Sequence, residues 1–396
     1  MNVKLAALPL GLVATGVLAQ DVSLEALLEL IESQEMRIAE LERRLDQTGD
    51  ELEATVDFVE ALEPATRADA TTIGGYGELH YNNLDASDAS NDLDEIDFHR
   101  FVLFVSHRLS DRIQFSSEIE IEHSLAGDGA PGEIELEQAY VDIALKDSLR
   151  AKAGLFLLPI GFLNETHEPP TFYGVERNNV ENVIIPTTWW EAGGGFSGDL
   201  KNGIGWDVMM HSGLEMPTSG GSAFRVRSGR QKVAEAIADN WAYTARLRYA
   251  GLPGLELGAS LQYQSDPSQV AGDGLDSGRL FSANLSYEID KFMIKALYGS
   301  WRFQGAAVEA AGADRQDGWF VEPSYRLNPR WGLFARYEEV EGARAVDQFS
   351  EAGAGFNFWP HPSVVLKFDY RQRDLDQPAL AGNDFDGFDL GIGYQF

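Results

Sequence analysis

The sequence predicts an all-β protein, a 16-stranded antiparallel transmembrane β-barrel preceded by a short N-terminal coiled-coil helix. Three observations predict this class. The chain begins with a pattern typical of an export signal, apolar and polar residues alternate from about residue 72 to residue 396, and the connections between these segments are short and long in turn. No run of 18 apolar residues occurs after the N-terminus, which excludes a helical membrane protein.

Residues 1–19 have the features of a signal peptide. Lys4 supplies a positive charge, an apolar centre runs from Leu5 to Leu18, and a small-residue cleavage site ends at Ala19. We expect cleavage after Ala19, with an uncleaved anchor helix as the alternative. The chain has no cysteine, so ladder hydrogen bonds and packing, rather than disulfides, must hold the exported protein together.

Residues 20–63 carry a heptad repeat that predicts a periplasmic coiled-coil helix. Apolar residues return at every seventh position, at Leu24, Ile31, Ile38, Leu45, Leu52 and Val59. Charged residues flank this seam, as expected at the e and g positions of a coiled coil, and an amphipathic helix lying on a globular body is the alternative. Pro64 ends the helix, and residues 64–71 form a linker.

Residues 72–396 form the predicted barrel. In the segment 112–123, for example, mostly apolar side chains share one face and polar side chains share the other. Seven short turns and eight longer polar segments make fifteen connections, hence sixteen strands. A closed barrel with an even number of strands leaves no open edge, as lipid requires. A soluble β-sandwich would show the same alternation, whereas a propeller would show a repeat of roughly 40 to 50 residues, which the sequence lacks.

One predicted strand ends in a Gly-x-Phe-x-x-Pro-x-Gly motif, formed by Gly154, Phe156, Pro159 and Gly161. In this motif, the heptad segment, the sixteen strands and the terminal aromatic residue, the chain resembles the phosphate-selective porin O and P family. The resemblance implies a homotrimer in the outer membrane of a Gram-negative bacterium, embedded in outer-membrane lipid. In the best-known members it also implies an anion-selective constriction lined by Arg and Lys.

The last strand shows a further resemblance, to outer-membrane barrels in general. Its alternating apolar residues and aromatic end look like the signal read by the barrel-assembly machinery. The residues that carry this signal are Leu390, Ile392, Tyr394 and Phe396.

The charge of the chain departs from the family pattern. The formal net charge is −32, and carboxylates around a pore favour cations, whereas Arg and Lys favour anions. We therefore expect a water-filled porin for passive diffusion of small hydrophilic solutes or ions, with weak cation preference or none. An anion- or phosphate-selective channel is the alternative, and an envelope structural or adhesive barrel is the alternative from another class.

Strand phase predicts which charged residues line the pore, because the apolar face must meet lipid. The acidic and basic residues assigned to the lumen are Glu118, Glu120, Glu122, Arg246, Arg248, Lys295, Arg336, Glu338, Lys367, Asp369, Arg371 and Arg373. Opposed acidic and basic walls would create a transverse field across the water column, or the charges would pair across neighbouring strands.

The segment 158–188 is rich in apolar residues that need a surface to pack on. We expect it to fold into the lumen and narrow the channel, with packing against a neighbouring protomer as the alternative. Its charged residues would then face the constriction, and these are Glu165, His167, Glu168, Glu176, Arg177 and Glu181.

Other motifs carry little weight. The glycines of 193–198 match a dinucleotide-binding pattern without the βαβ context that it needs. The seven histidines show no metal-ligand spacing, so the sequence predicts no metal and no cofactor. Basic residues are scattered and outnumbered, which argues against nucleic acid as a partner. No Ser, His and Asp set stands out on one rim, so we expect no enzyme.

Overall fold

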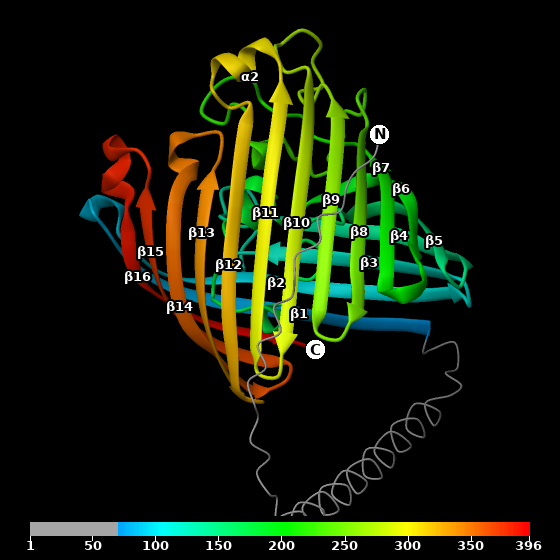
Figure 1. Cartoon of the computed structure of the whole chain (residues 1–396), viewed down its shortest axis with the longest axis horizontal. Coiled ribbons are helices and arrows are strands. Elements are labelled where there is room, and N and C mark those ends of the chain that lie inside the picture. Colours follow the sequence, from blue (N-terminus) through cyan, green and yellow to red (C-terminus); the bar gives the residue numbers. More distant parts are fainter. Residues whose placement is uncertain (1–69) are drawn as a thin grey trace, which may run out of the picture. The chain divides into compact units, whose positions relative to one another are not determined.

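The computed structural model describes residues 70–396, and these form a closed barrel of sixteen antiparallel strands (Figure 1). The first eight strands are β1 (Thr71–Ala86), β2 (Leu93–Ser110), β3 (Ile113–Glu122), β4 (Ile134–Lys146), β5 (Leu149–Leu157), β6 (Trp190–Asp199), β7 (Ile204–His211) and β8 (Ala242–Leu252). The last eight are β9 (Leu255–Ser265), β10 (Ser277–Ile289), β11 (Phe292–Gln304), β12 (Arg315–Asn328), β13 (Trp331–Glu341), β14 (Gln348–His361), β15 (Val364–Leu375) and β16 (Phe385–Gln395). The predicted fold class is thereby confirmed for the barrel, while the signal peptide, the coiled coil and most of the linker lie outside the described residues.

Each strand pairs with its neighbours in sequence, and β1 pairs with β16 to close the cylinder. At this seam the amide of Gly75 donates to the carbonyl oxygen of Phe396 at 3.0 Å, and the amide of Phe396 donates to that of Gly75 at 2.9 Å. Farther along the seam, Asn82 Nδ2 donates to Asp389 Oδ1 at 2.6 Å. The two ends of the barrel segment therefore form one continuous ladder.

The short connections lie at one rim and the long connections at the other, which we call the long-loop rim. Several long connections contain single helical turns: η2 (Ala89–Asn91), η3 (Pro169–Thr171), η4 (Val180–Ile184), η6 (Val226–Gly229), α2 (Ala306–Ala310), η7 (Ala345–Asp347) and η8 (Pro378–Asn383). A further turn, η5 (Lys201–Gly203), joins β6 to β7 at the short-turn rim. Within residues 70–396, no helix is both long and apolar enough to cross a membrane.

The two faces of the barrel wall differ in polarity. On the outside, large apolar side chains are exposed, among them Leu247, Leu261 and Phe281, which are 57%, 60% and 42% exposed. Positions of the opposite phase on the same strands carry Arg246, Ser260 and Ser282, which point inward. This is the arrangement that a wall between lipid outside and water inside requires.

Candidate functional site

The connection between β5 and β6, residues 158–189, is called the lumen loop because it contacts inward-facing residues around the barrel. Its side chains and backbone reach partners on five well-separated strands: His80 on β1, Glu118 on β3, Ser260 on β9, Trp301 on β11 and Arg336 on β13. Since these partners surround the barrel axis, the lumen loop lies inside the channel. This is the position expected for the segment 158–188.

Apolar packing holds one side of the lumen loop against the wall. Val180, Ile184 and Ile185 are fully buried and pack on inward-facing apolar residues of β10 to β14. The wall residues of this cluster are Leu280, Leu297, Trp301, Phe320, Val340 and Phe349. Gly318 also makes room for the loop, because a Cβ there would lie 2.9 Å from Cγ1 of Ile184.

Glu181 organises the inside of the lumen loop. Its Oε1 accepts hydrogen bonds from the amides of Phe162 at 2.5 Å and Leu163 at 2.7 Å, and its Oε2 accepts one from Asn178 Nδ2 at 2.9 Å. Burial raises the pKa of the Glu181 carboxyl above its usual value, and these donors oppose that rise. Glu181 therefore connects the two halves of the loop. It does not face the constriction, which is where we expected it from the sequence.

Polar contacts hold the far part of the loop to β13 and β15. The amide of Val175 donates to Asp369 Oδ2 at 2.7 Å, and the amide of Asn179 donates to Glu338 Oε2 at 2.8 Å. Nη2 of Arg336 donates to the carbonyl oxygen of Tyr173 at 2.8 Å. These predicted pore residues point inward, but the loop covers them.

Glu176 connects the loop to β1. Its Oε1 lies 3.1 Å from His80 Nδ1 and accepts a hydrogen bond from Asn82 Nδ2 at 3.1 Å. Burial alone would raise the pKa of the Glu176 carboxyl, but the neighbouring His80 and Arg371 hold it well below its usual value. The carboxylate is thus charged and serves as an anchor on this wall.

The predicted acidic wall on β3 is also covered. Glu118 and Glu120 are each only 1% exposed, and Glu118 lies 3.1 Å from Nε2 of His167 in the lumen loop. Glu120 pairs with Arg100 at 3.3 Å. Lys232, from the connection 212–241, forms ion pairs with Glu135 of β4 and with Glu133 just before that strand. These carboxylates therefore contribute little to the field in open water.

The remaining predicted pore residues on β15 pair within the wall. Arg371 Nε lies 2.5 Å from Asp389 Oδ2, and Arg373 Nη2 lies 2.6 Å from Glu351 Oε2. The ammonium of Lys367 lies 3.4 Å from the centre of the Phe172 ring in the lumen loop. Cross-strand pairing thus satisfies this wall, as one of the two sequence-based interpretations proposed.

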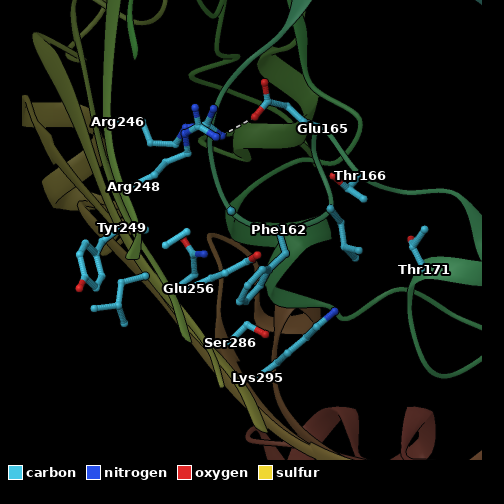
Figure 2. A pocket seen from close by; sticks show the side chains of 16 residues that line it. Phe162, Glu165, Thr166, Thr171, Arg246, Arg248, Tyr249, Glu256, Ser286 and Lys295 are labelled. Carbon is cyan, nitrogen blue, oxygen red and sulfur yellow. Dashed lines mark hydrogen bonds and ion pairs between the residues drawn. The ribbon is translucent and has the colours of Figure 1, made fainter. Parts of the chain in front are cut away.

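Open space lies on the opposite side of the lumen loop, against β8 to β11. A cavity of ≈ 340 Å³ lies between loop residues 161–171 and these strands, and its charged lining residues are Glu165, Arg246, Arg248, Glu256 and Lys295 (Figure 2). Figure 2 shows Arg246 and Arg248 extending from β8 toward Glu165 of the loop, with Lys295 at the other end of the cavity.

Arg246 bridges the wall and the loop in this cavity. It forms an ion pair with Glu165 of the lumen loop and another with Asp207 of β7, to which Nε donates at 2.8 Å. Arg248 is 48% exposed at its side chain and lies 3.8 Å from Asp207. Lys295 lies 5.6 Å from the centre of the Phe162 ring and forms no ion pair among the described residues.

A second cavity of ≈ 260 Å³ continues toward the short-turn rim. It shares Thr171 and Lys295 with the first, and its other charged lining residues are Glu288, Lys291 and Arg326. Together the two cavities have five basic and three acidic lining residues. The lining of these two cavities therefore carries net positive charge, although the chain as a whole is strongly acidic.

The structure separates the sequence-predicted site residues into two groups. Glu165, Arg246, Arg248 and Lys295 border the first cavity, whereas the other predicted pore and loop residues are not among its lining residues. Sequence reasoning missed Glu256 and the apolar lumen residues under the loop. Strand phase could have revealed these apolar residues, because Leu297, Phe320 and Val340 alternate with the lipid-facing positions of their strands and so point inward.

Comparison with known proteins places this geometry among channels. Residues 190–345 match the family of Gram-negative porins. An uncharacterized protein from Aquifex aeolicus (strain VF5) is 31% identical over 343 residues, which cover 76% of this chain and 76% of that protein.

Solved structures share the fold at low sequence identity. An anion-selective porin from Comamonas acidovorans is 12% identical with a TM-score of 0.58, and the match covers 82% of this chain and 99% of that one. OmpF from Salmonella typhi is also 12% identical, with a TM-score of 0.57 and coverage of 84% and 99%. At this identity the likeness concerns the barrel alone.

Proposed function

We propose that this chain, a Gram-negative outer-membrane porin of one family with the Aquifex aeolicus protein, forms a channel that prefers small anions to cations. The chain forms an outer-membrane channel for passive diffusion of small hydrophilic solutes. The observation that carries the proposal is the lining of the two cavities, with five basic residues and three acidic ones. The net charge favoured weak cation preference or none, and the proposal takes the anion-selective alternative instead, because charges on the outer loops and charges under the lumen loop do not line the two cavities.

The size of the effect follows from simple electrostatics. A unit charge about 10 Å from an ion in water contributes about 0.4 kcal/mol. Removal of the two positive charges of Arg246 and Arg248 would then change the free energy of an anion in the cavity by about 0.8 kcal/mol before screening by salt, which is a factor of about four in local anion concentration. This magnitude suits a weakly selective diffusion pore rather than a tight binding site.

The test is the reversal potential across a planar bilayer under a salt gradient. We expect anion preference for the unmodified porin and a shift toward cations in Arg246→Gln/Arg248→Gln. The matched control is Arg112→Gln/Arg330→Gln, which removes the same charge from exposed positions at the short-turn rim. Cation preference in the unmodified porin, or equal shifts in both double variants, would contradict the proposal.

Phosphate is the anion to test first, since the sequence resembles the phosphate-selective porin O and P family around Gly154 and Pro159. Block of chloride current by millimolar phosphate in the unmodified porin, lost in Arg246→Gln/Arg248→Gln, would support this finer assignment. Unchanged chloride current at every phosphate concentration would count against it.

We also propose the assembly that the sequence implies. Three protomers would form the porin, cleavage after Ala19 would release the mature chain, and the barrel-assembly machinery would read the last strand. The exposed side chains of Leu390, Ile392 and Phe396 support the last point, because they are 43%, 38% and 62% exposed on the outer face. Native mass spectrometry of the purified porin tests the trimer and the mature N-terminus together. The fold and family are those of a channel, so we propose no enzymatic activity.

A further inference from the structure

Two histidines and an aspartate converge near the long-loop rim, on the wall formed by β1 to β3. Asp97 and His99 belong to β2, and His123 directly follows β3. Asp97 Oδ2 lies 3.1 Å from His99 Nδ1 and 2.9 Å from His123 Nδ1. One ligand atom from each of the three residues lies within 4.8 Å of the other two. The three side chains are 17%, 28% and 35% exposed, so water and ions can reach them.

Local backbone features bring these residues together. The pairing of β1 and β2 shifts register between Glu78, which faces Arg100, and His80, which faces Asp97. Two residues of β2 therefore oppose one residue of β1, and such a bulge changes the direction of the side chains that follow. Directly after β3, the left-handed conformation of His123, with φ of 51°, turns the chain back, and its amide donates to the carbonyl oxygen of His99 at 3.3 Å.

The neighbourhood fixes the orientation of the His99 ring. His80 stacks on it with ring centres 4.6 Å apart, and Glu78 and Glu176 hold His80 at 3.3 Å and 3.1 Å. Arg100, the adjacent cation, pairs with Glu78 at 2.7 Å. Contacts with a second layer of residues typically hold the rings of metal-binding histidines in place, and the stacked His80, itself held by two carboxylates, makes such a contact with His99.

From these contacts we infer that Asp97, His99 and His123 form a binding site for a divalent transition-metal ion such as Zn²⁺. Imidazole nitrogen and carboxylate oxygen both bind zinc at about 2.0–2.2 Å, which sets the edges of a tetrahedral site at about 3.3 Å. The two donor separations that involve Asp97 need to widen by only a few tenths of an ångström to reach that value. Three protein ligands leave the fourth position to water.

The sequence had predicted no metal, because no two histidines stand at ligand spacing. Two ligands come from β2 and the third from the residue after β3, and a bulge and a turn bring them together, so only the folded barrel forms the site. Mg²⁺ and Ca²⁺ require oxygen ligands and are not expected to compete.

The experiment measures Zn²⁺ binding to the purified full-length porin by isothermal titration, with Mg²⁺ as the comparison ion. We expect one Zn²⁺ per chain. Loss of a residue that only supports a metal ligand usually lowers metal affinity 10- to 100-fold. Because His123 is itself a ligand, the Zn²⁺ affinity of His123→Ala should fall by at least this factor. The matched control is His361→Ala, which removes an exposed histidine near the short-turn rim and should leave the affinity unchanged.

Copper provides a direct readout of the ligands. The electron paramagnetic resonance spectrum of the Cu²⁺-loaded porin should show coupling to two imidazole nitrogens, reduced to one in His123→Ala. Migration of the unheated protein in SDS gels reports whether each variant closes its barrel. If a variant does not close, Asp97→Asn is tested in its place. Equal Zn²⁺ affinity in the unmodified porin and in variants of the site, or a Cu²⁺ spectrum without nitrogen coupling, would overturn the assignment.

Discussion

Replacement of Trp301 by alanine removes the side chain that ties the lumen loop to β11. The indole is fully buried, Nε1 donates to the carbonyl oxygen of Ile184 at 2.9 Å, and the ring stacks on Phe303 with centres 5.1 Å apart. Loss of a buried Trp or Phe side chain costs about 3–5 kcal/mol. Each 1.4 kcal/mol is a factor of ten, so the equilibrium between the docked and the loosened loop would shift by roughly 140- to 4000-fold.

The barrel ladder does not depend on this side chain, so the porin should still insert and conduct. Single-channel recordings should then show a higher mean conductance with more open-channel noise. The matched control is Trp331→Ala, which removes an indole from the outer face, where Trp331 is 38% exposed and packs near Phe356 and Phe358. Unmodified conductance and noise in Trp301→Ala, with normal insertion, would refute the view that docking of the loop sets the width of the channel.

Further predictions concern the loop, the covered wall and the closing strand. Glu181→Ala, which leaves the amides of Phe162 and Leu163 without their acceptor, should raise conductance, and an unaltered channel would argue against its organising role. Gly318→Val should lower thermal stability by about 1–3 kcal/mol through overpacking against the loop, as measured by thermal melting in detergent. Glu118→Gln should leave the reversal potential almost unchanged, because this carboxylate is covered, and a large shift would show that it faces the water. Deletion of Phe396 should lower the yield of assembled trimers on unheated gels without altering the conductance of the channels that insert.

Much of the barrel could be predicted from the sequence because strand phase and turn chemistry are local properties. The segment 112–123 contains β3, and seven short and eight longer connections join the sixteen strands, as predicted. The phase argument also assigned Arg246, Arg248 and Lys295 to the lumen, and they border the open cavity.

The channel charge could not be predicted in the same way, because it depends on which charges the lumen loop covers. The net charge gives Glu118 and Arg246 the same weight. However, Glu118 is buried under His167, whereas Arg246 borders the first cavity. The same limit explains the missed metal ligands, since the approach of His99 and His123 depends on the pairing of strands.

The seam between β1 and β16 has a consequence for the order of folding. Asn82 and Asp389 bond across 307 positions of the chain, and closure of a loop of that length costs about 5 kcal/mol of chain entropy, plus a constant. Contacts between distant parts of a chain form late, because this entropy is lost before the contact stabilises anything. Until Phe396 is available to pair with Gly75, the sheet has two unpaired edges, and unpaired edges favour aggregation.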